Sequence, residues 1–296
     1  MKNVLIIGAT GYLGSYVTNF FLNNNYNVTI IIRKNSKLDR INDIFSLLEI
    51  IILDDYDFLN KLNSKSYSIF INASVEYGKG INEELKVLES NVLFPFKILY
   101  NLNKDKNFLF FTFDSFYTKP EFIHKNILPS YVLSKIQLNQ WLEIYTKRED
   151  NINTFILSIE HLVGPNECSS KFNGWLIEKL KSKVSKIDLT NCNQIRDFIY
   201  VKDVVSSIFV ILQNLSEFNK RIVRIEVGSG KGHSIRKFVE LLAKKIKSNV
   251  KLNFGALDFN EKNDIMISIA NNQKLIDLGW KPITSLEQIV DNILKD

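Results

Sequence analysis

Val4-Leu-Ile-Ile-Gly-Ala-Thr-Gly-Tyr-Leu-Gly14 is an apolar run that ends in three glycines spaced three residues apart. The apolar residues predict a buried strand, and the glycines let the chain turn sharply into a helix and approach a ligand closely. Amide groups at a helix N-terminus favour a pyrophosphate, although a purely structural turn is the alternative. The residues expected to contact a dinucleotide here are Gly8, Thr10, Gly11, Tyr12, Leu13 and Gly14.

The rest of the chain extends this pattern into a fold. At 296 residues it is long enough for one large α/β unit and a smaller lobe. Apolar runs alternate with amphipathic stretches through the first two thirds, which predicts an α/β fold with a doubly wound, Rossmann-like parallel sheet. Strands are expected near residues 3–8, 27–32, 49–53, 68–73, 107–113 and 153–159.

The alternation weakens after Gly164-Pro165. Residues 1–164 are predicted to form the dinucleotide-binding domain with its catalytic helix, and residues 165–296 mainly a substrate-binding lobe. Some segments are expected to return to the first domain, so no clean boundary is predicted. Within the lobe we expect short strands at 185–189 and 223–227 and helices at 204–212 and 235–246.

Composition narrows the class of protein. Apolar residues make up 45% and charged residues 24%, which is ordinary for a soluble globular protein, and no run is long enough to cross a bilayer. Met1-Lys2-Asn3 leads directly into the first strand and leaves no room for a signal peptide, so we expect the cytoplasm. The net charge of +6 comes from scattered lysines, which argues against nucleic acid and suits a phosphate-bearing substrate.

Cys168 and Cys192 are the cysteines of the chain. They lack the density of a disulfide scaffold and the spacing of a zinc site. We therefore expect two thiols and no metal.

Arg33 and Lys34 follow the second strand, where such folds usually place an acid that binds the adenosine ribose. A carboxylate would repel a 2′-phosphate, whereas a guanidinium and an ammonium attract it. NADP(H) is therefore expected as the cofactor, with NAD(H) as the alternative. If neither residue binds a cofactor, Arg33 and Lys34 are solvated surface cations.

Further cofactor contacts are expected after the third and fourth strands. Asp54 and Asp55 fit either acceptors for the adenine amino group or turn residues. Residues 73–77 should pass beneath the phosphates at Ala73 and Ser74 and reach toward the substrate at Glu76. Asn91, on the following helix, is expected to orient active-site backbone or water.

Tyr131 and Lys135 are four residues apart, so on a helix they share one face. The positive charge of the lysine, with that of an oxidised nicotinamide, is expected to lower the pKa of the tyrosine. Tyr131 would then exchange a proton with a substrate carbinol or carbonyl while the nicotinamide exchanges hydride. The pair predicts a redox enzyme.

With these motifs, the chain resembles the extended short-chain dehydrogenase/reductase family, which acts on nucleotide sugars. Gln194–Asp203, Val227-Gly-Ser-Gly230 and Leu278-Gly-Trp-Lys-Pro282 resemble further motifs of that family. Within it, a narrower resemblance is to the 4-ketoreductases of dideoxyhexose assembly. The segments that carry this are Asp114-Ser-Phe116, Glu160-His161 with Gly164-Pro165, and Ile269-Ala-Asn-Asn272.

The resemblance implies roles in substrate binding. Arg196 would bind the substrate's diphosphate through paired hydrogen bonds. Glu160 and His161 would lie near the sugar or the nicotinamide, although His161 also fits a packed structural histidine. Asn173, with Phe172 and Trp175, would shape the nucleotide pocket unless the two rings belong to the core. Family members are commonly dimers through paired helices, which implies a homodimer here.

One departure from the family pattern concerns the hydroxyl that normally hydrogen-bonds the reacting oxygen. The family places it at the end of the fifth strand, where this chain has Phe113. Strand alternation directs Thr112 to the opposite face, so Ser115 is the favoured replacement and Thr112 the alternative. Ser158 and Lys202 are smaller departures, where the family often has Arg and Asp.

The leading expectation is NADPH-dependent reduction of the C4 keto group of a nucleotide-linked deoxysugar, for surface polysaccharide synthesis. An NAD-dependent nucleotide-sugar 4-epimerase or dehydrogenase is the enzymatic alternative. A dinucleotide-sensing regulator without catalysis is the other class, and Phe113 is the residue that favours it.

Overall fold

The computed structural model describes residues 1–78, 80, 82–168, 171–259 and 264–295. The chain divides into two compact units. The first combines Met1–Ser158 with Asn214–Ile225, and the second combines Ile159–Gln213 with Glu226–Asp296.

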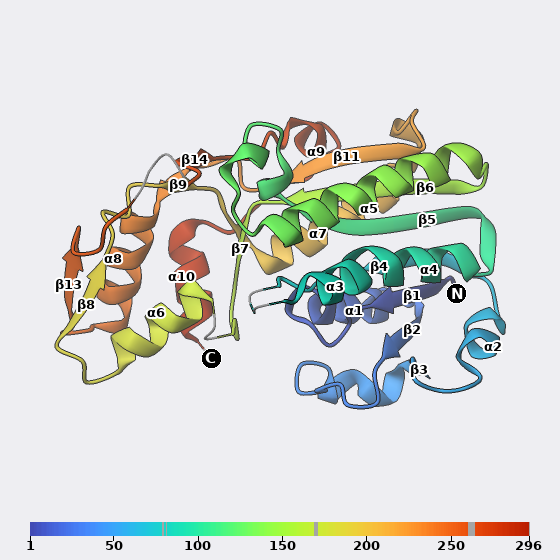
Figure 1. The fold of residues 1–296 in the computed structure, drawn as a ribbon, viewed down its shortest axis with the longest axis horizontal. Helices are drawn as coiled ribbons and strands as arrows, with labels where there is room; N and C mark the ends of the chain where they lie inside the picture. Colours follow the sequence, from blue (N-terminus) through green and yellow to red (C-terminus); the bar gives the residue numbers. More distant parts are fainter. Residues whose placement is uncertain (79, 81, 169–170, 260–263, 296) are drawn as a thin grey trace. The chain divides into compact units, whose positions relative to one another are not determined.

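A seven-stranded sheet forms the centre of the first unit, in the order β11-β6-β5-β4-β1-β2-β3 (Figure 1). β1 pairs in parallel with β2 and β4, β2 with β3, and β4 with β5. The strand order reverses between β1 and β4, and ligands of such sheets bind beyond the carboxyl ends of the strands at this point. The strands are β1 (Asn3–Ile7), β2 (Asn27–Ile32), β3 (Glu49–Ile52), β4 (Tyr67–Asn72), β5 (Lys104–Ser115), β6 (Ile152–Ile159) and β11 (Ile222–Val227).

The six strands predicted from apolar runs are confirmed, as is the Rossmann-like α/β class. The segment at 223–227, however, was wrongly expected in the substrate lobe, because it forms the edge strand β11 of the main sheet. Its burial alternates along the strand, whereas β1 is buried almost throughout. A continuous apolar run indicates a central parallel strand, and this half-exposed edge strand lacks one.

Helices and apolar strand residues form the core of the first unit. Leu5, Phe70 and Phe110 come from neighbouring strands and are fully buried. Leu138 and Leu142 pack against this cluster from one face of α5, so the core fixes the rotation of that helix. The helices are α1 (Tyr12–Asn23), α2 (Phe58–Asn63), α3 (Glu84–Leu88), α4 (Phe94–Asn101) and α5 (Pro129–Arg148).

The second unit holds small sheets and helices. β7 (His161–Val163) pairs with β10 (Phe198–Tyr200), β8 (Lys186–Leu189) pairs with β13 (Lys251–Phe254), and β9 (Ile195–Arg196) lies between β12 (His233–Ser234) and β14 (Ile267–Ser268). Its helices are α6 (Phe172–Lys181), α7 (Val201–Gln213), α8 (Ile235–Ile246), α9 (Gln273–Asp277) and α10 (Leu286–Leu294). The strand expected at 185–189 and the two helices expected here are confirmed as β8, α7 and α8.

Two simpler expectations concern thiols and membranes. Cys168 and Cys192 are present as thiols, exposed and buried respectively, as expected. Within the described ranges, no helix is both long enough and apolar enough to span a bilayer.

Candidate active site

The glycine turn lies between β1 and α1, at the reversal of strand order. Gly8 has a φ of +77°, and a Cβ there would lie 2.4 Å from the Ala73 carbonyl carbon. A Cβ on Gly14 would lie 2.0 Å from the Gly8 oxygen. These two glycines therefore permit close backbone packing, whereas a Cβ on Gly11 would meet only the Gly8 oxygen, at 3.1 Å. At Gly11 the absence of a side chain leaves open space beside the turn instead of relieving a backbone clash.

Helix α1 begins directly after this turn, with Gly11 as its N-cap. Its first turn contains no acidic residue, so nothing there opposes an anion. Thr10 and Leu13 are partly exposed beside it, and the Arg40 guanidinium lies over the Tyr12 ring, 5.3 Å from its centroid. The residues present fit the diphosphate of a dinucleotide, with Arg40 as a cation that the motif did not reveal.

Arg33 and Lys34 are exposed just beyond β2. The backbone N–H of Lys34 donates to Asp54 Oδ2 at 3.1 Å, while Asp55 forms an ion pair with Lys61 at 2.8 Å. Both acids thus stabilise local backbone or side chains. The side chains of Arg33 and Lys34 are exposed at the surface beyond β2.

Asn72 ends β4 and connects two of the expected site residues. Its Oδ1 accepts hydrogen bonds from the backbone and hydroxyl of Ser74, at 3.2 and 2.7 Å. Its Nδ2 donates to Thr112 Oγ1 at 3.0 Å, and the Ala73 N–H donates to the Ile7 oxygen at 2.9 Å. These bonds hold the start of the loop after β4 against β1 and β5.

Asn91 links the same loop to helix α5. It lies in a π-helical turn at Glu89–Leu93, a feature that often marks functional sites. Its side chain accepts from the Glu76 N–H at 2.7 Å and donates to the Glu76 oxygen at 2.8 Å and to Ser134 Oγ at 2.9 Å. Ser134 in turn donates to the Tyr131 carbonyl at 2.7 Å. Asn91 therefore holds the Glu76 backbone against α5.

The carboxylate of Glu76 belongs to the same loop. Desolvation alone would raise the pKa of Glu76, but hydrogen bonding to Lys86 and to the backbone of Gly78 and Tyr77 outweighs it and lowers the pKa. The Lys86 ammonium lies 3.1 Å from Glu76 Oε2. Glu76 is therefore an ionised acceptor.

Tyr131 and Lys135 are both buried on α5 and share one face. The Lys135 ammonium lies 5.8 Å from the centroid of the Tyr131 ring and donates to the Phe113 carbonyl at 2.9 Å. The side chain of Tyr131 hydrogen-bonds to that of Ser115, and its ring lies 5.0 Å from that of Tyr77. One phenol, one ammonium and one alcohol are thus gathered at the end of β5.

The lowering of the Tyr131 pKa by Lys135 together with an oxidised nicotinamide stays a prediction, and in the protein alone the shift is in the other direction. Burial, with the electrostatic influence of Tyr77 and Asp114, raises the pKa of Tyr131 well above its ordinary value, against the opposing Ser115 hydrogen bond. Burial also lowers the pKa of Lys135 to about 8. Desolvation disfavours both charged forms and outweighs their mutual stabilisation at this separation. Tyr131 is therefore a neutral phenol at neutral pH.

The hydroxyls near Phe113 have different surroundings. Phe113 itself is buried, and Thr112 is bound to Asn72 on β4. Ser115 contacts Tyr131, and its Oγ also accepts from the Tyr117 N–H at 3.4 Å. Ser115 is thus the hydroxyl that lies beside the phenol.

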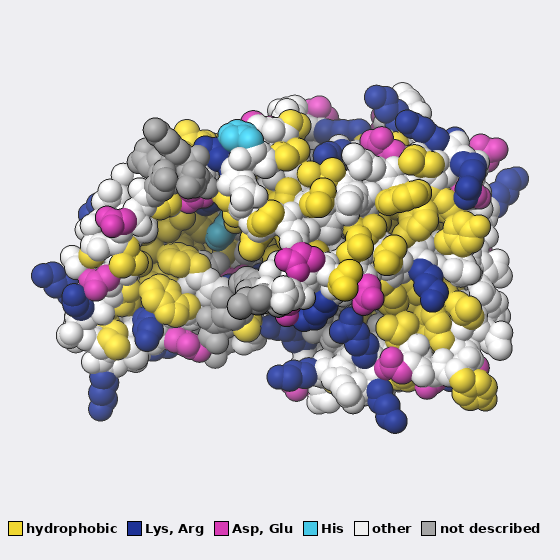
Figure 2. Space-filling view, in the orientation of Figure 1, with side chains coloured by type: hydrophobic (Ala, Val, Ile, Leu, Met, Phe, Trp, Pro, Cys, Tyr) yellow, Lys and Arg dark blue, Asp and Glu magenta, His cyan; other side chains and the backbone are white. Residues whose placement is uncertain are grey.

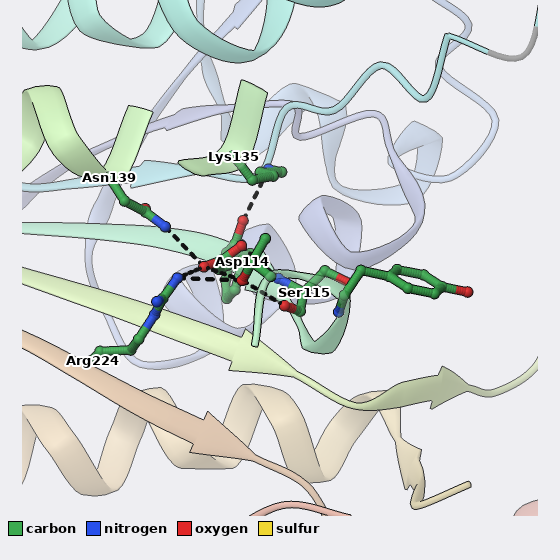
Figure 3. A network of polar contacts seen from close by, with 8 residues as sticks. Asp114, Ser115, Lys135, Asn139 and Arg224 are labelled. Atoms are coloured by element: carbon green, nitrogen blue, oxygen red, sulfur yellow. Dashed lines mark hydrogen bonds and ion pairs between the residues drawn. The ribbon is translucent and has the colours of Figure 1, made fainter. Parts of the chain in front are cut away.

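Asp114 is the centre of a polar network beside this site (Figure 3). Its Oδ1 accepts from the Ser115 N–H at 2.8 Å. Its Oδ2 accepts from Thr118 Oγ1 at 2.9 Å, from Asn139 Nδ2 at 2.8 Å and from Arg224 Nη2. Asn139 could have been found from its spacing of four residues after Lys135 on the helix. Arg224, 110 residues from Asp114, offered no such signal.

In the second unit, Arg196 and Asn173 are buried. Arg196 Nη2 lies 3.4 Å from Asp264 Oδ1. Asn173 donates to Glu167 at 2.8 Å, and its Oδ1 is buried without a hydrogen-bond partner among the described residues. Such an unsatisfied acceptor is costly unless a ligand donates to it.

Glu160 and His161 also lie in this unit. The buried Glu160 carboxylate accepts from Ser268 Oγ at 2.8 Å. Burial, then the charges of Arg196 and Lys171, lower the pKa of His161 to about 3, so the imidazole is neutral. Its ring contacts that of Phe198 edge to face. Both side chains thus have protein partners.

Four further residues named from the sequence lie on α6, β6 and α7: Phe172, Trp175, Ser158 and Lys202. The rings of Phe172 and Trp175 lie 6.1 Å apart on α6. Ser158 is buried at the end of the first unit's main segment, and Lys202 is exposed.

Two relatives cover almost the whole chain. CDP-abequose synthase of Salmonella muenchen is 29% identical over 293 residues, which cover 99% of this chain and 97% of that protein. A putative UDP-glucose 4-epimerase of Methanocaldococcus jannaschii is 26% identical over 307 residues, covering 98% and 97%.

Solved structures share the fold. UDP-glucose-4-epimerase from Stenotrophomonas maltophila, with bound NAD and formylated UDP-arabinopyranose, aligns with a TM-score of 0.82 at 17% identity and covers 100% of this chain and 97% of its own. RMD from Pseudomonas aeruginosa, complexed with NADPH, aligns with a TM-score of 0.75 at 16% identity and covers 99% of both chains.

The profile of the NAD dependent epimerase/dehydratase family matches residues 4–227. The resemblance drawn from the sequence motifs, including the narrower one to CDP-abequose synthase, is thereby confirmed. The chain belongs to the NAD dependent epimerase/dehydratase family, within the extended short-chain dehydrogenases/reductases.

Proposed function

We propose that this protein is an NADPH-dependent reductase that converts the C4 keto group of a nucleotide-linked deoxysugar to an alcohol. The observation that carries the proposal is the cluster of Tyr131, Lys135 and Ser115 at the end of β5. The similarity to CDP-abequose synthase over nearly the full chain supports a deoxysugar substrate. We propose surface polysaccharide synthesis in the cytoplasm as its setting.

The chemistry follows from the protonation state of these groups. Tyr131 is a neutral phenol and donates its proton to the carbonyl oxygen as that oxygen becomes an alcohol. The Ser115 hydroxyl hydrogen-bonds the same oxygen and stabilises its developing negative charge. Lys135 stabilises the phenolate that remains after proton transfer. When bound, the reduced nicotinamide supplies the hydride.

The raised pKa of Tyr131 suits reduction, because the proton donor must be protonated before the reaction. An oxidation would need the phenolate as base. The epimerase alternative is favoured by the Methanocaldococcus jannaschii relative, and it predicts tightly held NAD with no net NADPH consumption. A sensing role has no use for the buried Tyr131 and Lys135 pair.

The substrate's nucleotide diphosphate is proposed to bind in the second unit. Arg196 offers a guanidinium fork that matches phosphate oxygens, and Asp264 would have to release or share it. The unsatisfied Asn173 Oδ1 would accept from a substrate N–H or O–H. Glu160 and His161 are proposed to border the sugar.

The direct test is turnover. Purified protein is mixed with NADPH and CDP-, dTDP-, GDP- or UDP-linked 4-keto sugars, while loss of nicotinamide absorbance is followed and the products are identified. We expect stoichiometric NADPH oxidation with one nucleotide series. Epimerised sugar without NADPH loss would instead support the alternative.

The Arg33→Asp substitution tests cofactor selection. A charge-assisted contact to the 2′-phosphate contributes about 1.5–3 kcal/mol, so NADPH binding should weaken about 10- to 150-fold while NADH binding changes little. Isothermal titration measures both affinities. Lys106→Asp, an exposed site at the other end of the sheet, is the charge-matched control. Equal losses for the two cofactors in Arg33→Asp would contradict the assignment.

The Ser115→Ala substitution tests the proposed hydrogen-bond donor. Loss of one such donor typically lowers kcat about 100-fold, and NADPH affinity should be unchanged. Thr112→Val is the matched comparison for the other hydroxyl; it removes the hydrogen bond from Asn72, so it should lower turnover per folded molecule less than Ser115→Ala does. The assignment fails if Thr112→Val is the more damaging variant in steady-state assays.

A homodimer is proposed from an exposed apolar surface. Figure 2 shows hydrophobic side chains gathered over the helices labelled α3, α4 and α5 in Figure 1. Large apolar interfaces with aromatic residues at their centre are typical of stable dimers. The exposed apolar residues there include Leu93, Tyr100, Leu133, Trp141 and Ile144.

Trp141→Glu should therefore convert a dimer to a monomer, because it introduces a charge into the buried centre of the interface. Sedimentation equilibrium gives the mass. Tyr56→Glu, at a fully exposed aromatic residue outside α3–α5, is the control and should leave the mass unchanged. A wild-type protein that is monomeric at all concentrations would refute the dimer.

A further inference from the structure

Asp114 is a buried carboxylate that the proposed chemistry does not use directly. Its side chain is 1% exposed, and it lies one residue before Ser115 at the end of β5. A carboxylate in such a place is strongly destabilising unless it is paired and hydrogen-bonded. The structure meets this need with partners from separate elements.

The partners converge on Asp114 from three directions (Figure 3). Asn139 donates from α5, the helix that carries Tyr131 and Lys135. Thr118 donates from the 3₁₀ turn at Phe116–Thr118. Arg224 forms an ion pair from β11, with its side chain 44% exposed. Arg224 therefore supplies a positive charge from the sheet edge.

This network determines where Ser115 lies. The Ser115 N–H donates to Asp114 Oδ1 at 2.8 Å, and the Thr118 hydroxyl, whose one proton is shared between Asp114 Oδ2 and the Ser115 carbonyl, lies 2.8 Å from that carbonyl oxygen. On the preceding side, the Phe113 carbonyl accepts from Lys135. The backbone around Ser115 is thus fixed by bonds that all involve Asp114, its Thr118 partner or Lys135.

We propose that Asp114 and Arg224 form a positioning pair that holds the Ser115 hydroxyl against Tyr131. The inference rests on the proposed reductase function. In this chain the donor comes from Ser115, the last residue of β5, because Phe113 occupies the usual position. The pairing of β5 with β4 runs to Thr112, and the 3₁₀ turn begins at Phe116, so the ion pair supplies rigidity where the strand ends.

The pair also sets the charge beside the phenol. The groups that act on the pKa of Tyr131 are Tyr77 from the loop after β4, Tyr117 from the 3₁₀ turn, and Asp114 and Ser115 from β5, and the Lys135 ammonium of α5 lies near its ring. The negative charge of Asp114 opposes formation of the phenolate, and Arg224 offsets that charge. Removing either partner should therefore move the titration of Tyr131, in opposite directions.

The experiment compares Asp114→Asn, Arg224→Met and Arg224→Lys with wild type. Both neutral variants should lower kcat about 10-fold or more through misplacement of Ser115, with the NADPH Kd unchanged. The alkaline limb of the kcat–pH profile, set first by Lys135 with its pKa of about 8 and then by Tyr131, should move to lower pH in Asp114→Asn and to higher pH in Arg224→Met. Arg224→Lys keeps the charge and should restore most of the rate.

Arg221→Met is the matched control. Arg221 precedes β11, its side chain is 39% exposed, and it contacts Lys147, Glu149 and Asp150 rather than Asp114. It should leave kcat and the pH profile unchanged. The inference is overturned if Arg221→Met has the same effect as Arg224→Met, or if the alkaline limbs of the two neutral variants do not separate.

A spectroscopic readout keeps this test separate from the function. The phenolate absorbance of Tyr131 is obtained as the difference between each variant and its Tyr131→Phe counterpart, without turnover. If no 4-keto sugar is reduced by wild type, the proposed function fails. Opposite shifts of the phenolate titration would still support the electrostatic pairing, and coincident titrations would overturn it.

Discussion

The close backbone contact between the β1–α1 turn and the residues after β4 is the constraint on which the rest of the site depends. Gly8 permits it, since a Cβ there would overlap the backbone of Ala73 and Ser74, and Gly14 permits the tight turn itself, since a Cβ there would overlap the backbone of Gly8. This contact places Gly8 beside Ser74, at the point where the strand order reverses. Backbone contacts alone therefore form the turn at the carboxyl ends of β1 and β4, the edge of the sheet where a cofactor is expected.

Asn72 and Asn91 extend this constraint toward α5, the helix that carries Tyr131 and Lys135. Asn72 connects the loop after β4 to Thr112 on β5, and Asn91 connects the same loop to Ser134 on α5. Tyr131 is thus held relative to the glycine turn by a short series of amide side chains. Apolar packing of Leu138 and Leu142 sets the rotation of α5 about its axis. The hydrogen bond from Asn91 to Ser134 sets its position along that axis.

The sequence predicted the parts of the protein that local pattern determines. Apolar runs located the six strands, and the spacing of Tyr131 and Lys135 correctly predicted a shared helix face. The strand at 223–227 was predicted, but its place at the edge of the main sheet was not, because its half-exposed pattern resembles that of many short strands. The raised pKa of Tyr131 depends on burial, and the Asp114–Arg224 pair depends on contact across 110 residues. Neither depends on spacing along the chain.

Asn91 has a consequence for how this chain tolerates sequence change. Its one amide group accepts one hydrogen bond and donates two, and it is almost fully buried. Aspartate lacks the donors, glutamine is one methylene longer, and serine has too few polar atoms. None of these substitutions reproduces all three hydrogen bonds, so each would leave a buried polar group unpaired. Position 91 can therefore change during evolution only after the loop or α5 has changed first.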